Sequence, residues 1–280
     1  MRPRIIFGHF LIRLGRFIQS QALMVMRPND LVEFSRQTYA SSRMVEDYCR
    51  EDLMYSGLHP DEQALLAKIQ LTGGRLLLLD VGDGREAIPL AKMGFEVTGV
   101  DFVPAMVEKA KDNAASHGVK IKGLAQEISK IDVPAESYDV AWLSTAMYSC
   151  VPTRGRRVEM LQRIGRALKP GGYFICQFRW ATEDGPAHLW ELARKIVAFL
   201  TLGNLWYEKG DTLSLNIEFI HAFSHEDEVR SEFAEGGFEV IHLHIAEELL
   251  LGGAVLRKPL SKASFAQRKD DSASSHTITM

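Results

Sequence analysis

Between residues 76 and 178, short hydrophobic runs alternate with segments of helical periodicity. The runs predict strands at 76–81, 96–101, 120–125, 138–144 and 173–178, and the segments between them predict helices at 87–92, 104–117 and 157–168. Short turns separate these elements. Strands that alternate with helices in this way indicate βαβ units with a parallel sheet and right-handed crossovers.

The pattern differs on both sides of this region. Residues 29–70 have helical periodicity and predict a helical cap. After residue 178, an aromatic-rich insertion at about 181–212 predicts one helix at 188–200 and a lid, and 213–219 alternates like a single strand. A capping box of Ser224 and Asp227 predicts a helix that ends near Gly236, followed by a closing hairpin from 238–245 and 253–258.

These changes divide the chain into three parts. Residues 1–70 form a basic N-terminal helix and a helical cap, 71–260 form the α/β domain with its lid insertion, and 261–280 form a polar tail that we expect to be disordered. A chain of 280 residues with 46% hydrophobic residues suits one such elaborated domain.

The first 27 residues combine apolar periodicity with positive charge. Ile6, Phe10, Leu14 and Ile18 recur every four residues, and five arginines precede the first acidic residue, Asp30. Such a helix can pack over the domain, pack against another subunit in a homodimer, or lie on an anionic membrane surface. The interrupted apolar run argues against a signal peptide.

Charge and cysteine content narrow the class of protein. The formal net charge of −3 and the pI near 6.3 argue against a nucleic-acid partner. The three cysteines, Cys49, Cys150 and Cys176, are too widely spaced for a zinc knuckle, and the histidines lack ligand spacing, so no metal is expected. We expect a reduced, cytoplasmic chain, with membrane contact limited to residues 1–27.

A glycine turn follows the first predicted strand in the stretch LLLLDVGDGREAIPLA. Gly82 and Gly84 allow a sharp turn and close approach of a ligand, and with Ala87 they satisfy the dinucleotide pattern G-x-G-x-x-A. Asp101 ends the second strand 17 residues after Gly84, where it can accept hydrogen bonds from a ribose. The turn therefore predicts a nucleoside ligand.

Charge at this turn distinguishes S-adenosylmethionine from NAD. Asp80 and Asp83 flank Gly82, and these acids would repel a pyrophosphate bound at the helix N-terminus. S-adenosylmethionine has no phosphate and carries an ammonium and a sulfonium, which a carboxylate favours. Asp80 could instead only cap the turn, but this explains the pair of acids less well. The sequence favours S-adenosylmethionine.

Residues 76–178 resemble the class I S-adenosylmethionine-dependent methyltransferases, especially the small-molecule branch. The resemblance rests on LDVGDGREAIPLA, VTGVDFVPAMVEKAKDNA, AQEISKIDVPAESYDVAWL and LQRIGRALKPGGYFICQF in order, with a late helix and strand in FSHEDEVRSEFAEGGFEVIHL. It implies a doubly wound, Rossmann-like and mostly parallel seven-stranded sheet whose last strand is antiparallel. It also implies S-adenosylhomocysteine as the product.

The resemblance also implies roles for individual residues on the donor side. Asp80, Gly82, Gly84 and Ser144 would surround the methionine moiety, Asp101 would hold the ribose hydroxyls, and Phe102, Glu127 and Ile128 would contact the adenine. One residue departs from the family pattern, because Glu86 occupies the position where the family often has a third glycine. This residue would lie at the end of the site that holds the methionine moiety of the donor.

Residues after the fourth and fifth strands should line the acceptor side, because ligands of open α/β sheets bind at the carboxyl ends of the strands. Tyr148, Arg179 and Trp180 are candidates there, with Tyr39 from the helical cap. Tyr148 and His188 are candidates for a catalytic role, His188 as a general base. For Tyr148, His188 and Arg179, ordinary packing or a surface position remains the alternative.

Three functions therefore remain open. The first is methyl transfer to a small, partly apolar or aromatic acceptor by in-line displacement, which alignment and exclusion of water suffice to catalyse. The second is a nicotinamide-dependent oxidoreductase on the same sheet. The third is a non-catalytic or membrane-associated S-adenosylmethionine-binding protein, since a fold alone does not determine function.

Overall fold

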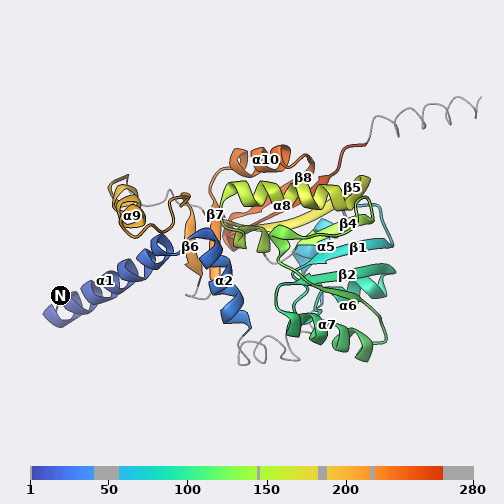
Figure 1. Ribbon diagram of the computed structural model, residues 1–280, viewed down its shortest axis with the longest axis horizontal. Coiled ribbons are helices and arrows are strands. Elements are labelled where there is room, and N and C mark those ends of the chain that lie inside the picture. Colours follow the sequence, from blue (N-terminus) through green and yellow to red (C-terminus); the bar gives the residue numbers. More distant parts are fainter. Residues whose placement is uncertain (1, 41–56, 144–145, 182–187, 215–217, 261–280) are drawn as a thin grey trace, which may run out of the picture.

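The computed structural model describes residues 2–40, 57–143, 146–181, 188–214 and 218–260, without the side chains of 16 and 188–193 (Figure 1). Its helices are α1 (Pro3–Val25), α2 (Pro28–Tyr39), α5 (Pro60–Leu66), α6 (Ala87–Lys92), α7 (Pro104–Ser116), α8 (Arg154–Ala167), α9 (His188–Leu200) and α10 (Glu226–Glu235). Its strands are β1 (Gly74–Leu79), β2 (Phe95–Asp101), β3 (Lys122–Ala125), β4 (Tyr138–Leu143), β5 (Leu168–Trp180), β6 (Asp211–Ser214), β7 (Glu218–Phe223), β8 (Glu239–Ala246) and β9 (Leu251–Arg257). Short 3₁₀ helices are η1 (Ile128–Lys130), η2 (Met147–Cys150) and η3 (Glu247–Leu249).

One sheet organises the molecule. Five parallel strands lie in the order β3-β2-β1-β4-β5, and β9 pairs antiparallel with both β5 and β8. The strand order reverses between β1 and β4. Open α/β sheets bind their ligands at such a reversal point. The predicted doubly wound sheet with an antiparallel last strand is confirmed. Within the described ranges the sheet has nine strands in place of seven, because β7 pairs with the end of β5 and carries β6.

The strand β1 explains why the sheet is covered on both faces. Its four consecutive leucines are fully buried. Leu77 and Leu79 belong to the hydrophobic cluster beneath α8 and α10, whereas Leu76 and Leu78 belong to the cluster on the opposite face with α5 and α6. A continuous apolar run is typical of a parallel strand buried on both faces.

Two local predictions after β5 are wrong. The alternation over 213–219 does not form one strand: β6 and β7 form an antiparallel pair in which Leu213 lies opposite Phe219. Period-two alternation continues through both arms of a hairpin and does not reveal the reversal, which lies outside the described residues. The capping box of Ser224 and Asp227 is not formed either, because α10 begins at Glu226 and its N-cap residue, His225, makes no side-chain cap bond.

A third hydrophobic cluster joins the N-terminal helices to the insertion. Leu23 and Met24 at the end of α1 pack with Leu31 of α2, Ala198 of α9 and Phe219 of β7. The rest of α1 extends away from the body (Figure 1). None of the helices within the described residues has the length and apolar content needed to cross a bilayer.

The packing of β9 on β5 leads to a test of the fold. A Cβ at Gly252 would overlap the ring of buried Phe178. Gly252→Ala should therefore lower the free energy of unfolding by about 1–3 kcal/mol through overpacking, measured by urea denaturation. Gly155 in α8 is exposed with open space around it, so Gly155→Ala should stabilise the helix by up to about 1 kcal/mol. Equal stabilities of the two variants would contradict the described β5–β9 packing.

Candidate active site

A cavity of about 450 Å³ lies at the carboxyl ends of the parallel strands. The turns after β1 and β2, the segment around η1, the segment around η2, β7 and α2 all contribute to its wall. This volume is typical of a site for a small molecule or cofactor. The cap helix α2 contributes Val32, Ser35 and Tyr39. The described residues of the 181–212 insertion do not line the cavity and pack instead beside α1.

The glycine turn after β1 forms one wall of the cavity. Asp80, Gly82 and Gly84 all have positive φ, at 64°, 51° and 97°. A Cβ at Gly82 would meet no atom within 4 Å, so the space beside this backbone is open. Gly84 does not line the cavity: it faces the backbone of Ala110 in α7, at 3.4 Å from a built Cβ. Gly82 therefore provides room for a ligand, and Gly84 allows helix packing.

Asp101 lies at the end of β2, beside this turn. Its carboxylate accepts hydrogen bonds from the backbone N–H of Gly82 at 3.1 Å and of Val103 at 2.8 Å. Burial raises the pKa of Asp101 to about 6, although these backbone hydrogen bonds lower it. The carboxylate is thus fixed in direction and aimed at the cavity, as a ribose ligand would require.

Acidic groups gather around Asp80. Burial, together with the charges of Asp101, Glu86 and Glu218, raises the pKa of Asp80 well above its usual value. Burial also raises the pKa of Asp83, whose Oδ2 has no hydrogen-bond partner among the described residues. A buried, unpaired carboxylate oxygen is costly unless a cation or donor meets it. The wall therefore suits a cationic ligand.

The charge of the nearby Arg85 lowers the pKa of Asp83 against the effect of burial, but its guanidinium is held by other groups. Its guanidinium donates to both carboxylate oxygens of buried Glu62 in α5, to the carbonyl of Gly57 at 2.6 Å, and to Glu86. Glu86, which stands where the family often has a third glycine, thus belongs to an ion-pair group that links α5 to the glycine turn. Nothing in the sequence indicated that Glu62 pairs with Arg85, because the two residues lie 23 positions apart.

The predicted adenine side is also assembled at the cavity. Phe102, Glu127 and Ile128 line it, with Met106 and Ser129 as additional wall residues. The Glu127 carboxylate accepts hydrogen bonds from the Ser129 hydroxyl and from Lys130 Nζ at 2.7 Å. Ser144 lies outside the described residues. Apart from Ser144 and Gly84, all predicted donor-side residues meet at this one cavity.

The opposite end of the cavity is formed by residues of β7, α2 and η2. The Tyr39 hydroxyl donates to Glu218 Oε2 at 2.8 Å, and the Cys150 thiol lies 3.8 Å from the same oxygen. Burial and the charge of Glu218 raise the pKa of Cys150 well above its usual value, so the thiol is neutral. Arg179 also lines this end. Glu218 was missed because the 213–219 stretch was interpreted as one packed strand.

Two other predicted residues are not brought to the cavity, and a third lies outside the described side chains. Tyr148 is fully buried, stacks near Phe223 and Phe233, and donates to Glu232 Oε2 at 2.7 Å. Trp180 is also part of the core. His188 begins α9, and its side chain lies outside the description. The roles proposed for Tyr148 and Trp180 are therefore corrected to core packing.

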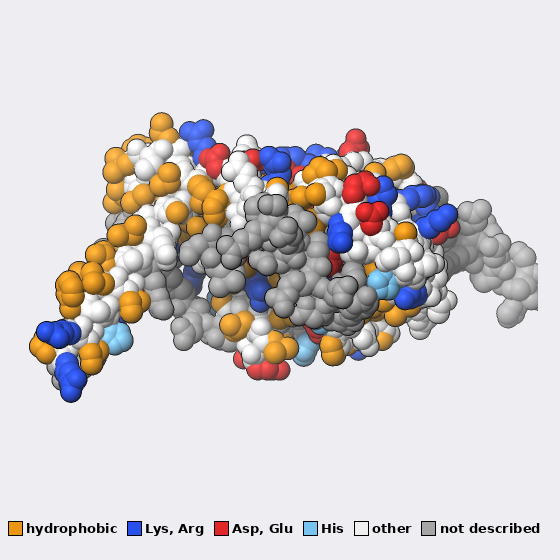
Figure 2. Space-filling model, turned by 90° about the horizontal axis from the view of Figure 1, so that it is seen from below, with side chains coloured by type: hydrophobic (Ala, Val, Ile, Leu, Met, Phe, Trp, Pro, Cys, Tyr) orange, Lys and Arg blue, Asp and Glu red, His pale blue; other side chains and the backbone are white. Residues whose placement is uncertain are grey.

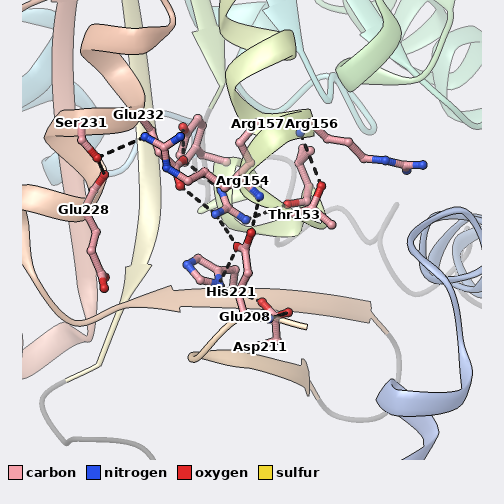
Figure 3. A network of polar contacts seen from close by, with 12 residues as sticks. Thr153, Arg154, Arg156, Arg157, Glu208, Asp211, His221, Glu228, Ser231 and Glu232 are labelled. Carbon is pink, nitrogen blue, oxygen red and sulfur yellow. Dashed lines mark hydrogen bonds and ion pairs between the residues drawn. The ribbon is translucent and has the colours of Figure 1, made fainter. Parts of the chain in front are cut away.

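Through Glu232, Tyr148 joins a buried polar network. Figure 3 shows this network around Arg157, Glu208 and Glu232. Arg157 is 1% exposed and donates to both oxygens of Glu232, at 2.7 and 2.9 Å, and to Glu208 at 2.7 Å. His221 Nδ1 contacts Asp211 Oδ1 at 2.8 Å. The network joins α8, α10, β6 and β7, so it holds the hairpin that carries Glu218.

Glu208, Asp211 and His221 also have the residue types of a metal site, with one ligand atom of each within 4.8 Å of the others. However, Glu208 is already bound by the Arg157 guanidinium, and Asp211 by His221. A divalent cation there would have to approach a buried, permanently charged arginine. We therefore interpret this group as part of the structural network.

The sheet order agrees with the fold of class I S-adenosylmethionine-dependent methyltransferases. Residues 77–172 match a protein family described as "Methyltransferase domain". The resemblance in the sequence is thereby confirmed for residues 77–172, which match a methyltransferase domain.

Individual relatives agree with this assignment. The chain is 36% identical over 140 residues to a ubiquinone biosynthesis O-methyltransferase of Paramagnetospirillum magneticum, covering 48% of this chain and 50% of that protein. It is 30% identical over 122 residues to a phosphatidylethanolamine N-methyltransferase of Cereibacter sphaeroides, covering 43% and 58%. The matches thus span about half the length of these relatives.

A solved structure shows the same fold over most of the chain. The 1,6-didemethyltoxoflavin-N1-methyltransferase of Burkholderia thailandensis superposes with a TM-score of 0.59 at 17% identity, over 83% of this chain and 90% of that chain. That structure contains 1,6-didemethyltoxoflavin and S-adenosylhomocysteine. At this identity the likeness concerns the fold.

The network around Arg157 leads to a stability prediction. Arg157→Met leaves the buried Glu232 carboxylate without its cation and should lower the free energy of unfolding by about 3–5 kcal/mol, measured by urea denaturation. The double variant with Glu232→Leu should recover part of this loss, because the buried carboxylate is then also absent, whereas the Tyr148 hydroxyl loses its acceptor.

Arg154 provides the matched control for this measurement. Its ion pair with Glu235 is largely exposed, so Arg154→Met should cost less than about 1 kcal/mol. Equal losses in the two single variants would show that the Arg157 network does not support the hairpin.

Proposed function

We propose that the chain transfers a methyl group from S-adenosylmethionine to a small, partly apolar acceptor. The observation that carries this proposal is the acidic glycine turn: Asp80 and Asp83 flank an open Gly82, with Asp101 fixed beside them. A pyrophosphate would be repelled by these carboxylates, whereas an ammonium and a sulfonium would be attracted. This argument disfavours a nicotinamide cofactor.

The residues of the turn fit the donor in distinct ways. The Asp101 carboxylate retains lone pairs that can accept the two ribose hydroxyls. Gly82 leaves space for the donor beside the turn, and Asp80 offers a carboxylate to the donor's ammonium. Phe102 and Ile128 provide apolar surface for the adenine ring, and Glu127 offers a carboxylate for its amino group.

The residues of the other end suit an acceptor with a transferable proton. Methyl transfer from the sulfonium forms a bond from carbon to the acceptor's oxygen or nitrogen, breaks the carbon–sulfur bond and leaves S-adenosylhomocysteine. The acceptor then loses a proton. Glu218 is the carboxylate at this end that can orient the acceptor's O–H or N–H and receive that proton.

The walls around Glu218 support a partly apolar acceptor. Val32, Met147, Val151 and Pro152 line the cavity together with Tyr39. Arg179 adds one cation, which can bind an anionic group of the acceptor. Two relatives are named for ubiquinone biosynthesis and for phosphatidylethanolamine, which supports testing phenols and amines carrying apolar groups.

A titration tests the donor site. We expect S-adenosylmethionine and S-adenosylhomocysteine, but not NAD, to bind the purified chain in isothermal calorimetry. Asp101→Ala should weaken binding at least about tenfold, because hydrogen bonds from two hydroxyls to a carboxylate are lost. Affinity should also fall as the pH is lowered from about 7.5 to about 5, because Asp101, with a pKa of about 6, becomes protonated and accepts less well.

Asp112→Ala is the control for this titration, because Asp112 is exposed on α7. It should bind like the wild type, and Asp101→Asn should show a flatter pH dependence. Tight NAD binding, or unchanged affinity in Asp101→Ala, would refute the donor site.

An acceptor screen tests the transfer. We expect S-adenosylhomocysteine release with at least one of three probes: phenolic acids, aliphatic amines, or phosphatidylethanolamine in mixed micelles. With the active probe, Glu218→Gln should lower kcat about a hundredfold through loss of the proton acceptor, without weakening donor binding. The exposed Glu248→Gln should behave as the wild type.

Two results of this screen would count against the proposal. Full activity of Glu218→Gln would exclude Glu218 as the acceptor-side base. Tight donor binding without transfer to any probe would favour a non-catalytic S-adenosylmethionine-binding protein.

A further inference from the structure

The helix α1 exposes an apolar face along most of its length. Six large side chains on it are 40–61% exposed: Ile6, Phe7, Phe10, Leu14, Phe17 and Ile18. At 3.6 residues per turn these six fall within an arc of about 120°. Leu11 at the edge of this face, and Ile5 and Ile12 on the other side of the helix, are 47–55% exposed as well. Exposed apolar surface of this extent is uncommon on a soluble protein and marks a place of interaction.

A second exposed apolar segment lies at the root of this helix. Phe199 and Leu200 end α9, and the following loop carries Leu202, Leu205 and Trp206, all 57–74% exposed. Trp is a residue typical of the boundary between water and lipid. Within eight residues, five large apolar side chains thus face solvent.

Hydrogen bonds hold the two segments side by side. The backbone N–H of Asn204 donates to the carbonyl of Met24 at 2.7 Å, and Arg27 Nε donates to the carbonyl of Leu202 at 2.8 Å. Gly203 packs against the backbone of Met24 and Val25. In Figure 2, hydrophobic side chains cover both α1 and the neighbouring α9 region at this end of the molecule. We call this combined surface the α1–α9 face.

The charge of the α1–α9 face is positive although the chain as a whole is acidic. By helical geometry, Arg2, His9 and Arg13 lie on one flank of the apolar arc of α1, and Arg4 lies on the other. No acidic residue precedes Asp30, in a chain of formal net charge −3. A second copy would bring its own arginines to an interface between two such faces, and the like charges would repel.

We propose that the α1–α9 face binds the surface of an anionic lipid membrane. The apolar arc enters the headgroup boundary, and the flanking arginines contact anionic headgroups. The helix lies in the surface and does not cross it, in agreement with its content of arginines. This proposal does not depend on methyl transfer and concerns a surface outside the cavity.

The docked arrangement has a consequence for the cavity. Only Met26 and Arg27 separate α1 from α2, and α2 lines the cavity with Val32, Ser35 and Tyr39. Docking therefore brings the cap of the cavity close to the lipid surface. An apolar acceptor that partitions into lipid could then reach the cavity from the membrane.

Vesicle sedimentation tests the proposal with the full chain. We expect binding to vesicles of phosphatidylcholine mixed with phosphatidylglycerol, at least about tenfold weaker binding to pure phosphatidylcholine, and weaker binding at high salt. Trp206 should report entry by a blue shift of tryptophan fluorescence that Trp206→Phe removes. Absence of binding to anionic vesicles would overturn the proposal.

Substitutions separate the contributions of charge and apolar surface. Arg4→Glu with Arg13→Glu, and separately Phe199→Ser with Trp206→Ser, should each reduce vesicle binding at least about tenfold. The controls are Arg166→Glu on α8 and Leu249→Ser in η3, both exposed and outside the face, and they should bind normally. Equal binding by all variants would overturn the proposal.

Light scattering distinguishes the membrane from a second copy. We expect the wild type and the variants to have the same mass in solution. A dimer that the face substitutions dissociate, together with no preference for anionic vesicles, would assign the face to self-association and overturn the proposal. Donor titration of the same variants should be unchanged, so failure here is distinguishable from failure of the proposed methyl transfer.

Discussion

The burial of β1 on both faces is the constraint on which the rest of the structure depends. Because Leu76–Leu79 are inaccessible from either side, the chain can turn only where this apolar run stops, at Asp80. The carboxyl ends of β2 and β4 lie beside that point by the registers of the parallel pairs. The packing of the core thus brings the glycine turn and Asp101 together, and it thereby determines where the cavity lies.

The same location imposes an electrostatic cost. Asp80, Asp83 and Asp101 are held in a partly buried wall where their pKa values are raised, and the nearest arginine, Arg85, is bound to Glu62. A folded protein that holds acids with raised pKa values loses stability as the pH rises from their ordinary pKa values through the raised ones. A cationic ligand would reduce this electrostatic cost. The free energy that burial of the acids takes from the stability of the free protein would therefore contribute to ligand affinity.

The sequence predicted the sheet from β1 to β5 because each strand is an apolar run bounded by turns, and the donor-side residues because they follow those strands directly. It did not predict Glu218, since the alternation around it conceals a hairpin. The sequence also predicted Tyr148 on the acceptor side. In the structure, Ala146 has a φ of 63° directly before η2, and Tyr148 within η2 is buried beside Glu232. Contacts such as Arg85–Glu62 depend on tertiary structure and have no local signal.

The hydrogen bond between Tyr39 and Glu218 also bears on the order of events during a reaction cycle. It joins α2, which covers the cavity, to the sheet through β7. An acceptor that takes the hydrogen-bonding capacity of Glu218 would compete with Tyr39 at the last residue of α2, whereas the packing of Leu31 on Phe219 holds the rest of the helix. Departure of the methylated product would restore the bond. The rate at which this one bond is exchanged would then influence how fast ligands leave, separately from the rate of the chemical step.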